Sequence, residues 1–225
     1  MSDSLGKVVP FYLVADQSGS MVDDIGEVNA GLLSLLAALQ SEPLAAAKTR
    51  FAVVGFADHA ITHLPLSDLR QIETMPTLSA GGTTSYAAAF QLLLQAIPED
   101  VAALKAEGYQ VSRPAVFLLT DGEPNRGDGW EQALAELTDP GFRARPNILA
   151  FGIGQSNHDV VRQVATRPEY AFAAAVGADT GKAIAEFAEA LSRSVVASGN
   201  ALAADQSALM IEAPKDFIPL ALDVV

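Results

Sequence analysis

The sequence predicts an α/β fold, with a doubly wound, Rossmann-like and mostly parallel sheet covered by helices on both faces. Apolar strand-like segments alternate with helical patterns, several of these strands lack polar alternation, and polar loops follow two of them. Alternation of strand and helix is typical of parallel sheets, and uninterrupted apolar strands are typical of sheets buried on both faces. Half of the 225 residues are apolar, so the chain can bury the core of one domain.

A strand and a helix are predicted first. Residues 7–15 form an apolar run rich in valine and aromatic side chains, which predicts a buried strand. Over residues 24–39, apolar positions recur at spacings of three and four, which predicts an amphipathic helix. Asp23 or Asp24 can cap its N-terminus, and Pro43 is expected to stop its continuation.

A hairpin and a second helix are predicted next. Residues 50–57 and 60–66 are separated by a short turn, which predicts an antiparallel pair with one strand at the edge of the sheet. The glycine-containing loop 79–85 leads into a helix, which Pro98 is expected to end or interrupt. The apolar face of this helix comprises Tyr86, Phe90, Leu93 and Ile97.

The C-terminal half repeats the alternation of strand and helix. The last helix carries its apolar side chains between Ile184 and Val195, and residues 198–206 are small and polar, which predicts a linker. We therefore expect one domain over residues 1–198 and a tail over residues 199–225 that adds a strand, wraps over the domain or docks elsewhere. The three predicted strands of this half are residues 114–120, 147–153 and 170–176.

The charge and composition exclude several classes of partner. A net charge of −13 disfavours nucleic acid and anionic membrane surfaces, because binding there relies on clustered lysine and arginine. The N-terminal apolar stretch is eight residues long, too short for a membrane span and a poor match to a signal peptide. The chain has no cysteine, so it has neither disulfides nor thiolate metal sites. We expect a cytoplasmic protein; the oligomeric state is left open.

Two polar loops follow strands that should be neighbours. Ligands of doubly wound sheets bind beyond the carboxyl ends of the strands. In a 3-2-1-4 strand order, Asp16 after the first strand and Asp121 after the fourth would converge. Ser18 and Ser20 alternate with Asp16, so several oxygens can face one centre. Carboxylate and hydroxyl oxygens suit a hard cation such as Mg²⁺.

These loops, together with a third, carry a resemblance to a known family. Asp-Gln-Ser-Gly-Ser at residues 16–20, Gly-Gly-Thr at 81–83 and Thr-Asp-Gly at 120–122, in this order and at these separations, resemble the three loops of a von Willebrand factor type A domain. The resemblance covers residues 8–198. In that family the loops build the metal-ion-dependent adhesion site, and the matching residues here are Asp16, Ser18, Ser20, Thr83 and Asp121.

The resemblance implies a fold, a metal and a role. It implies a six-stranded sheet with one antiparallel edge strand, a bound Mg²⁺ or Mn²⁺ with Ca²⁺ as a third candidate, and binding rather than catalysis. The metal would capture an Asp or Glu of a protein partner. Thr84 lies beside Thr83 and is the alternative ligand from the second loop.

Two longer segments narrow the resemblance. "VPFYLVADQSGSM" and "RPAVFLLTDGEPN" are similar to the small bacterial tellurium-resistance-associated proteins of the TerY type. This similarity implies an adaptor in a bacterial stress system, with a protein kinase or a phosphatase of the same system as candidate partners. No catalytic residue and no enzymatic activity are expected.

Three other interpretations of the first loop compete with this one. The Asp and Ser side chains could simply cap a helix. In an EF-hand, Asp16 would be the first ligand and Glu27 the twelfth, but Met21 stands where that loop needs glycine. In a metal-assisted phosphatase, Asp16 would be the nucleophile, but Ser18 occupies the position of the general acid.

Two further features have alternative interpretations. A scaffold whose binding is insensitive to chelators is the structural alternative for the whole domain. His59 and His63 fall in the predicted hairpin, where a spacing of four does not bring two side chains together as it does on a helix, so they are expected to be surface or turn histidines.

Overall fold

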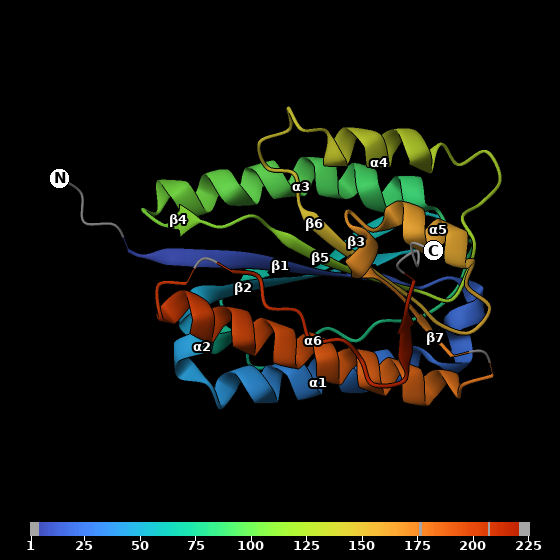
Figure 1. Ribbon diagram of the computed structural model, residues 1–225, viewed down its shortest axis with the longest axis horizontal. Coiled ribbons are helices and arrows are strands. Elements are labelled where there is room, and N and C mark those ends of the chain that lie inside the picture. Colours follow the sequence, from blue (N-terminus) through green and yellow to red (C-terminus); the bar gives the residue numbers. More distant parts are fainter. Residues whose placement is uncertain (1–4, 176, 207, 221–225) are drawn as a thin grey trace, which may run out of the picture.

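The computed structural model describes residues 5–175, 177–206 and 208–220, and its centre is one twisted sheet between two layers of helices (Figure 1). The strands follow the order β3-β2-β1-β5-β6-β7-β8, and β4 pairs with β1. The strands are β1 (Lys7–Asp16), β2 (Thr49–Phe56), β3 (Ala60–Ser67), β4 (Gln110–Val111), β5 (Ala115–Thr120), β6 (Asn147–Gly152), β7 (Ala171–Ala174) and β8 (Phe217–Pro219).

The helices form two layers. Those on one face are α1 (Ile25–Gln40), α2 (Pro43–Lys48) and α6 (Thr180–Ala203); those on the other are α3 (Tyr86–Ala106), α4 (Trp130–Thr138) and α5 (His158–Val164). Short 3-10 helices are η1 (Gly19–Asp23), η2 (Leu69–Gln71) and η3 (Pro168–Tyr170). The predicted α/β fold is confirmed.

The six predicted strands are all present, and two short ones are added. β1, β2, β5, β6 and β7 are parallel, whereas β3 runs antiparallel to β2 as the hairpin pattern predicts. The β2–β3 pairing contains two register shifts, and Pro65 lies within β3. The sequence did not predict β4 and left a strand in the tail as one of three alternatives, because segments of two or three residues carry no periodic signal.

The sequence of the central strand β1 lacks polar alternation because both of its faces are buried. Successive side chains of a strand point to opposite faces. Phe11 and Leu13 enter the core beneath α1 and α6, whereas Tyr12 and Val14 enter the core beneath α3 and α4. Both faces of β1 are therefore covered, and Asp16 lies at its carboxyl end, at one end of the sheet.

Of three predicted helix boundaries, the first is confirmed and the other two are wrong. The first helix ends at Gln40, before Pro43, as predicted, and Pro43 then begins α2, since proline is tolerated in the first turn of a helix. Pro98 lies inside α3, which continues to Ala106 because Leu93, Ile97 and Leu104 are buried on either side of it. The predicted linker at 198–206 is mostly helical, because α6 runs to Ala203.

The start of α1 also differs in detail. Asp23 lies in η1, and the side chain of Asp24 makes no capping hydrogen bond at the start of α1. The first turn after β1 is a 3-10 helix, and Asp24 occupies the predicted N-cap position of α1 without a capping side-chain hydrogen bond.

The tail both covers α6 and adds a strand, which are two of the three arrangements left open by the sequence. Ser198 Oγ accepts a hydrogen bond from Met210 N at 2.9 Å, and Ser194 Oγ accepts one from Glu212 N at 2.9 Å. Beyond these contacts β8 pairs antiparallel with β7. Residues 1–4 and 176 of the predicted domain, and 207 and 221–225 of the tail, lie outside the described residues.

The helix α3 is 21 residues long and largely apolar. By length and composition alone, α3 could cross a membrane. Its apolar side chains pack on the sheet in one of the two cores, as those of core helices do.

Candidate metal centre

The carboxyl ends of β1 and β5 bring the first and third loops together. The Asp16 side chain is fully buried at the end of β1. Its Oδ1 accepts a hydrogen bond from the Ser18 amide at 2.8 Å, and its Oδ2 accepts one from Thr120 Oγ1 at 2.7 Å. Tyr86 in turn donates to Thr120 Oγ1 at 3.0 Å. These contacts fix the Asp16 carboxylate from both strands.

A chain of hydrogen bonds continues through the serines to the second aspartate. The hydroxyls of Ser18 and Ser20 are 3.0 Å apart, and Ser20 Oγ donates to Asp121 Oδ1 at 2.8 Å. Four of the five predicted site residues, Asp16, Ser18, Ser20 and Asp121, are thus brought together.

The pKa values of both aspartates are raised above their ordinary value. Burial raises the pKa of Asp16, against the hydrogen bonds from Thr120 and Ser18, and the charge of Asp121 raises it further. Burial also raises the pKa of Asp121, against the hydrogen bond from Ser20. Among the residues that the structure describes, no lysine or arginine forms an ion pair with either aspartate.

More acidic side chains surround the centre. Burial and the charges of nearby acids, Asp121 foremost among them, raise the pKa of Asp24. The other acids that contribute are Asp23, Asp179 and Glu27. A site with this excess of negative charge favours a cation.

The donor set fits a hard divalent cation. Two carboxylates and adjacent hydroxyls supply only oxygen, which is the ligand atom that Mg²⁺, Mn²⁺ and Ca²⁺ prefer. Within the described ranges, no group of three or more His, Cys, Asp or Glu side chains could hold a metal ion. A metal at this centre would therefore depend on the serine and threonine hydroxyls as well as the two aspartates.

The second loop places its two threonines differently. Thr83 donates to Asp58 Oδ1 through its amide at 3.0 Å and through its hydroxyl at 2.6 Å. Thr84 is buried, and a Cβ added to Gly122 would lie 3.5 Å from Thr84 Oγ1 and 3.9 Å from Asp16 Oδ2. The Thr84 hydroxyl therefore lies on the Asp16 side of the loop, whereas that of Thr83 is held by Asp58.

Asn125 couples the third loop to both threonines. Its Oδ1 accepts a hydrogen bond from the Thr84 amide at 3.2 Å, and its Nδ2 donates to Thr83 Oγ1 at 2.9 Å. Sequence patterns did not reveal these contacts, because the partners of Asn125 lie about forty residues away in the chain.

Gln17 is a second residue whose role the sequence did not reveal. Its Nε2 donates to Ser79 O at 2.6 Å, and its Oε1 is 2.8 Å from His63 Nε2. Because Gln17 Oε1 can only accept, His63 must carry its proton on Nε2. Gln17 thus ties the first loop to the second and to β3, and His63 is half-buried instead of a free surface histidine.

Comparisons with known proteins agree with the family and with the fold. The family model described as von Willebrand factor type A domain matches residues 11–189. A search of curated proteins found no match. Pilus adhesin SpaC from Lactobacillus rhamnosus GG, in an open conformation, has a TM-score of 0.66 and 17% identity over 85% of this chain and 30% of that one.

Two further solved structures come from the mussel byssus. Proximal thread matrix protein 1 has a TM-score of 0.60 and 18% identity over 84% of this chain and 48% of that one. The same protein with a zinc-occupied MIDAS motif has a TM-score of 0.53 and 20% identity over 86% of this chain and 46% of that one. The chain spans less than half the length of each of these relatives, and at these identities the likeness concerns the fold.

Proposed function

The chain belongs to the von Willebrand factor type A domain family, and from this premise we propose that it is a metal-dependent protein-binding domain. Domains of this family often serve adhesion or protein interaction that depends on a metal. The observation that carries the proposal is the hydrogen-bonded chain from Asp16 through Ser18 and Ser20 to Asp121. In the described ranges, no basic side chain forms an ion pair with either aspartate.

The residues that would hold the metal are Asp16, Ser18, Ser20 and Asp121, with Thr83 or Thr84 from the second loop. A divalent cation, Mg²⁺ or Mn²⁺ with Ca²⁺ as third candidate, would supply positive charge for a carboxylate oxygen of a partner's Asp or Glu. Thr120 and the Ser18 amide orient Asp16, and Ser20 orients Asp121, so the chain's own hydrogen bonds preorganise the donors.

We propose binding in preference to hydrolysis. A phosphatase that used Asp16 as nucleophile would need a general acid at position 18, where this chain has a serine. The hydroxyl of Ser18 is also hydrogen-bonded to Ser20. These features support a domain without catalytic residues.

The cellular setting is proposed from the sequence resemblance. The two segments that are similar to TerY-type proteins support an adaptor role in a bacterial stress or tellurium-resistance system, in the cytoplasm. A kinase or phosphatase of that system, with an exposed Asp or Glu, is the partner we would test first.

Calorimetric titration of Mg²⁺ and Mn²⁺ into chelator-stripped protein tests the proposal. Wild type should bind one ion saturably, and Asp16→Ala and Asp121→Ala should lose binding while circular dichroism stays unchanged. Asp205→Ala, at an exposed aspartate that pairs with Lys7 at the start of β1, is the matched control and should bind as wild type. Binding that is absent, or indifferent to both site aspartates, would contradict the metal site.

The partner is tested separately. Capture of the candidate kinase or phosphatase should require the metal and should be lost in EDTA. Capture that persists in EDTA would favour the chelator-insensitive scaffold.

A further inference from the structure

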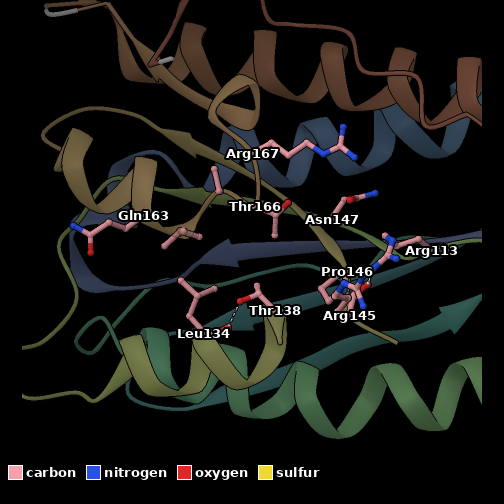
Figure 2. A pocket seen from close by; sticks show the side chains of 11 residues that line it. Arg113, Leu134, Thr138, Arg145, Pro146, Asn147, Gln163, Thr166 and Arg167 are labelled. Atoms are coloured by element: carbon pink, nitrogen blue, oxygen red, sulfur yellow. Dashed lines mark hydrogen bonds between the residues drawn. The ribbon is translucent and has the colours of Figure 1, made fainter. Parts of the chain in front are cut away.

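A cavity of about 490 Å³ lies at the end of the sheet opposite to the metal centre, where β5 and β6 begin. Figure 2 shows Arg113 and Arg145 close to one another on one side of this cavity, with Asn147 and Thr166 in its middle and Arg167 on the other side. The end of α4 and the segment between α5 and η3 complete its wall. We call this space the arginine cavity.

The charge of the arginine cavity is opposite to that of the molecule. Three of the 14 lysines and arginines in a chain of net charge −13 line it, and none of its lining residues is Asp or Glu. A neighbouring cavity of about 290 Å³ shares Arg113, Asn147 and Arg167 and is also lined without an acid. Beyond it, Lys7 and Arg113 line a third cavity of about 320 Å³, again without one.

Two of the guanidinium groups are held by main-chain oxygens. Arg113 Nη1 donates to Arg145 O at 2.9 Å, and Arg145 Nη1 donates to Pro140 O at 2.6 Å. Each bond uses one of the five N–H groups of its guanidinium and orients the rest. The arginines are therefore positioned without being neutralised.

Their charges are poorly compensated within the protein. In the described part of the chain, Arg113 and Arg145 form no ion pair, and Arg167 lies 3.8 Å from Glu169 with both side chains more than half exposed. Exposed pairs of this kind contribute little. Burial lowers the pKa of Arg113, and the charges of Arg145 and Arg167 lower it further, so the three groups repel one another.

We propose that the arginine cavity binds a small molecule that carries a phosphate or diphosphate group. Guanidinium groups bind phosphate oxygens in pairs, and three positive charges match a multiply charged phosphate better than a single carboxylate. The volume falls in the range of small-ligand pockets. A nucleic acid is disfavoured because the molecule as a whole carries a net charge of −13, which repels a phosphate backbone.

The test is calorimetric titration of inorganic pyrophosphate and orthophosphate at low ionic strength into protein that has been stripped with EDTA and then dialysed free of the chelator. EDTA removes divalent metals, so binding reports on the arginine cavity and not on the metal centre. Wild type should bind at least one probe saturably with one-to-one stoichiometry. Arg113→Gln and Arg167→Gln should each weaken binding by roughly tenfold, the effect of losing one charge-assisted contact.

Arg143→Gln is the matched control, because Arg143 lies two residues before Arg145 and does not line the cavity. It should change the affinity by less than about twofold, as expected of an exposed charge. Asp121→Ala should bind pyrophosphate as wild type. Circular dichroism checks folding, and Arg167→Gln covers the case in which loss of the Arg113 hydrogen bond disturbs the loop.

Four results would overturn the proposal. One is no saturable binding of either probe at millimolar concentration, and another is equal weakening by Arg143→Gln and the cavity variants, which would indicate diffuse attraction. The third is loss of binding in Asp121→Ala. The fourth is tighter binding of citrate than of pyrophosphate, which would assign the cavity to polycarboxylates.

Discussion

The two ends of the sheet collect opposite charges and hold them by different means. At the carboxyl ends of β1 and β5, a fully buried Asp16 and its neighbour Asp121 are held by hydroxyls and one amide. At the start of β5 and β6, more exposed arginines are held by main-chain carbonyls. Neither group is neutralised in the described part of the chain, so each end carries charge that a ligand of opposite sign could compensate.

Reciprocal variants should have the largest effects and test whether the two ends are independent. Asp16→Ala should weaken Mg²⁺ binding by about 100-fold or more, because a buried carboxylate ligand is lost, and should leave pyrophosphate binding unchanged. Arg113→Gln should weaken pyrophosphate binding by roughly tenfold and leave Mg²⁺ binding unchanged. Calorimetry of both variants with both ligands checks this, and a large cross-effect in either direction would show that the ends are coupled.

Arg50 lies at the same end of the sheet as the arginine cavity but, unlike the cavity arginines, is buried beside an aspartate, Asp68. Arg50, at the start of β2, is buried and lies 3.7 Å from Asp68, which also binds Arg70. Burial raises the pKa of Asp68, but the hydrogen bonds from Arg70 and the charges of Arg50 and Arg70 outweigh it, so the pKa lies below its ordinary value. Asp68→Asn should lower the free energy of unfolding by about 2 kcal/mol, because it leaves Arg50 buried without its partner.

The same pair predicts the direction of a pH effect. Asp68 binds its proton more weakly in the folded protein, so its contribution is complete above the unfolded pKa and is lost as pH falls toward the folded value. Urea denaturation at neutral and acidic pH should show a loss of stability in wild type that is smaller in Asp68→Asn. An equal loss in both would mean that other groups dominate acid unfolding.

Substitutions in the second loop should have smaller effects on Mg²⁺ binding, and they distinguish Thr83 from Thr84 as the ligand. Thr84→Val should weaken Mg²⁺ binding by roughly tenfold, whereas Thr83→Val should change it by less than about threefold, because the Thr83 hydroxyl is engaged with Asp58. Both substitutions keep the side-chain shape. The opposite ranking would assign the ligand to Thr83.

The smallest expected effect concerns the hydrogen bond between His63 of β3 and Gln17 of the first loop. His63→Ala should lower the free energy of unfolding by about 1 kcal/mol, since it removes this hydrogen bond. Burial lowers the pKa of His63, so the neutral form is favoured in the folded protein and stability should fall as pH drops below the ordinary value for histidine. Chemical denaturation at several pH values checks both points; a pH slope that is unchanged in the variant would exclude His63 as its source.

The two ends also differ in how well the sequence predicted them. The clustering of Asp16, Ser18, Ser20 and Asp121 was predicted because these residues follow strands in short motifs, so that local spacing translates into proximity once β1 and β5 are neighbours. The arginine cavity was not, because Arg113, Arg145 and Arg167 belong to separate loops that only the fold brings together. The different placement of Thr83 and Thr84 depends on Asp58, which lies in the β2–β3 turn and carries no recognisable motif.

For the fold, long apolar strands were predicted and several boundaries were not. β1, β5 and β6 bury almost all of their residues, so composition alone identifies them. Pro98 and the end of α6 were misjudged because tertiary packing and hydrogen bonds from the tail outweigh local helix preferences there.

The addition of β8 has a consequence for association between molecules. An unpaired edge strand can template intermolecular β-sheet growth, and β8 covers the β7 edge against it. At the other edge, Pro65 cannot donate a backbone hydrogen bond, and two register shifts disturb the ladder of β3. Strand-by-strand aggregation is therefore disfavoured at both margins, and loss of the C-terminal segment would expose the β7 margin to it.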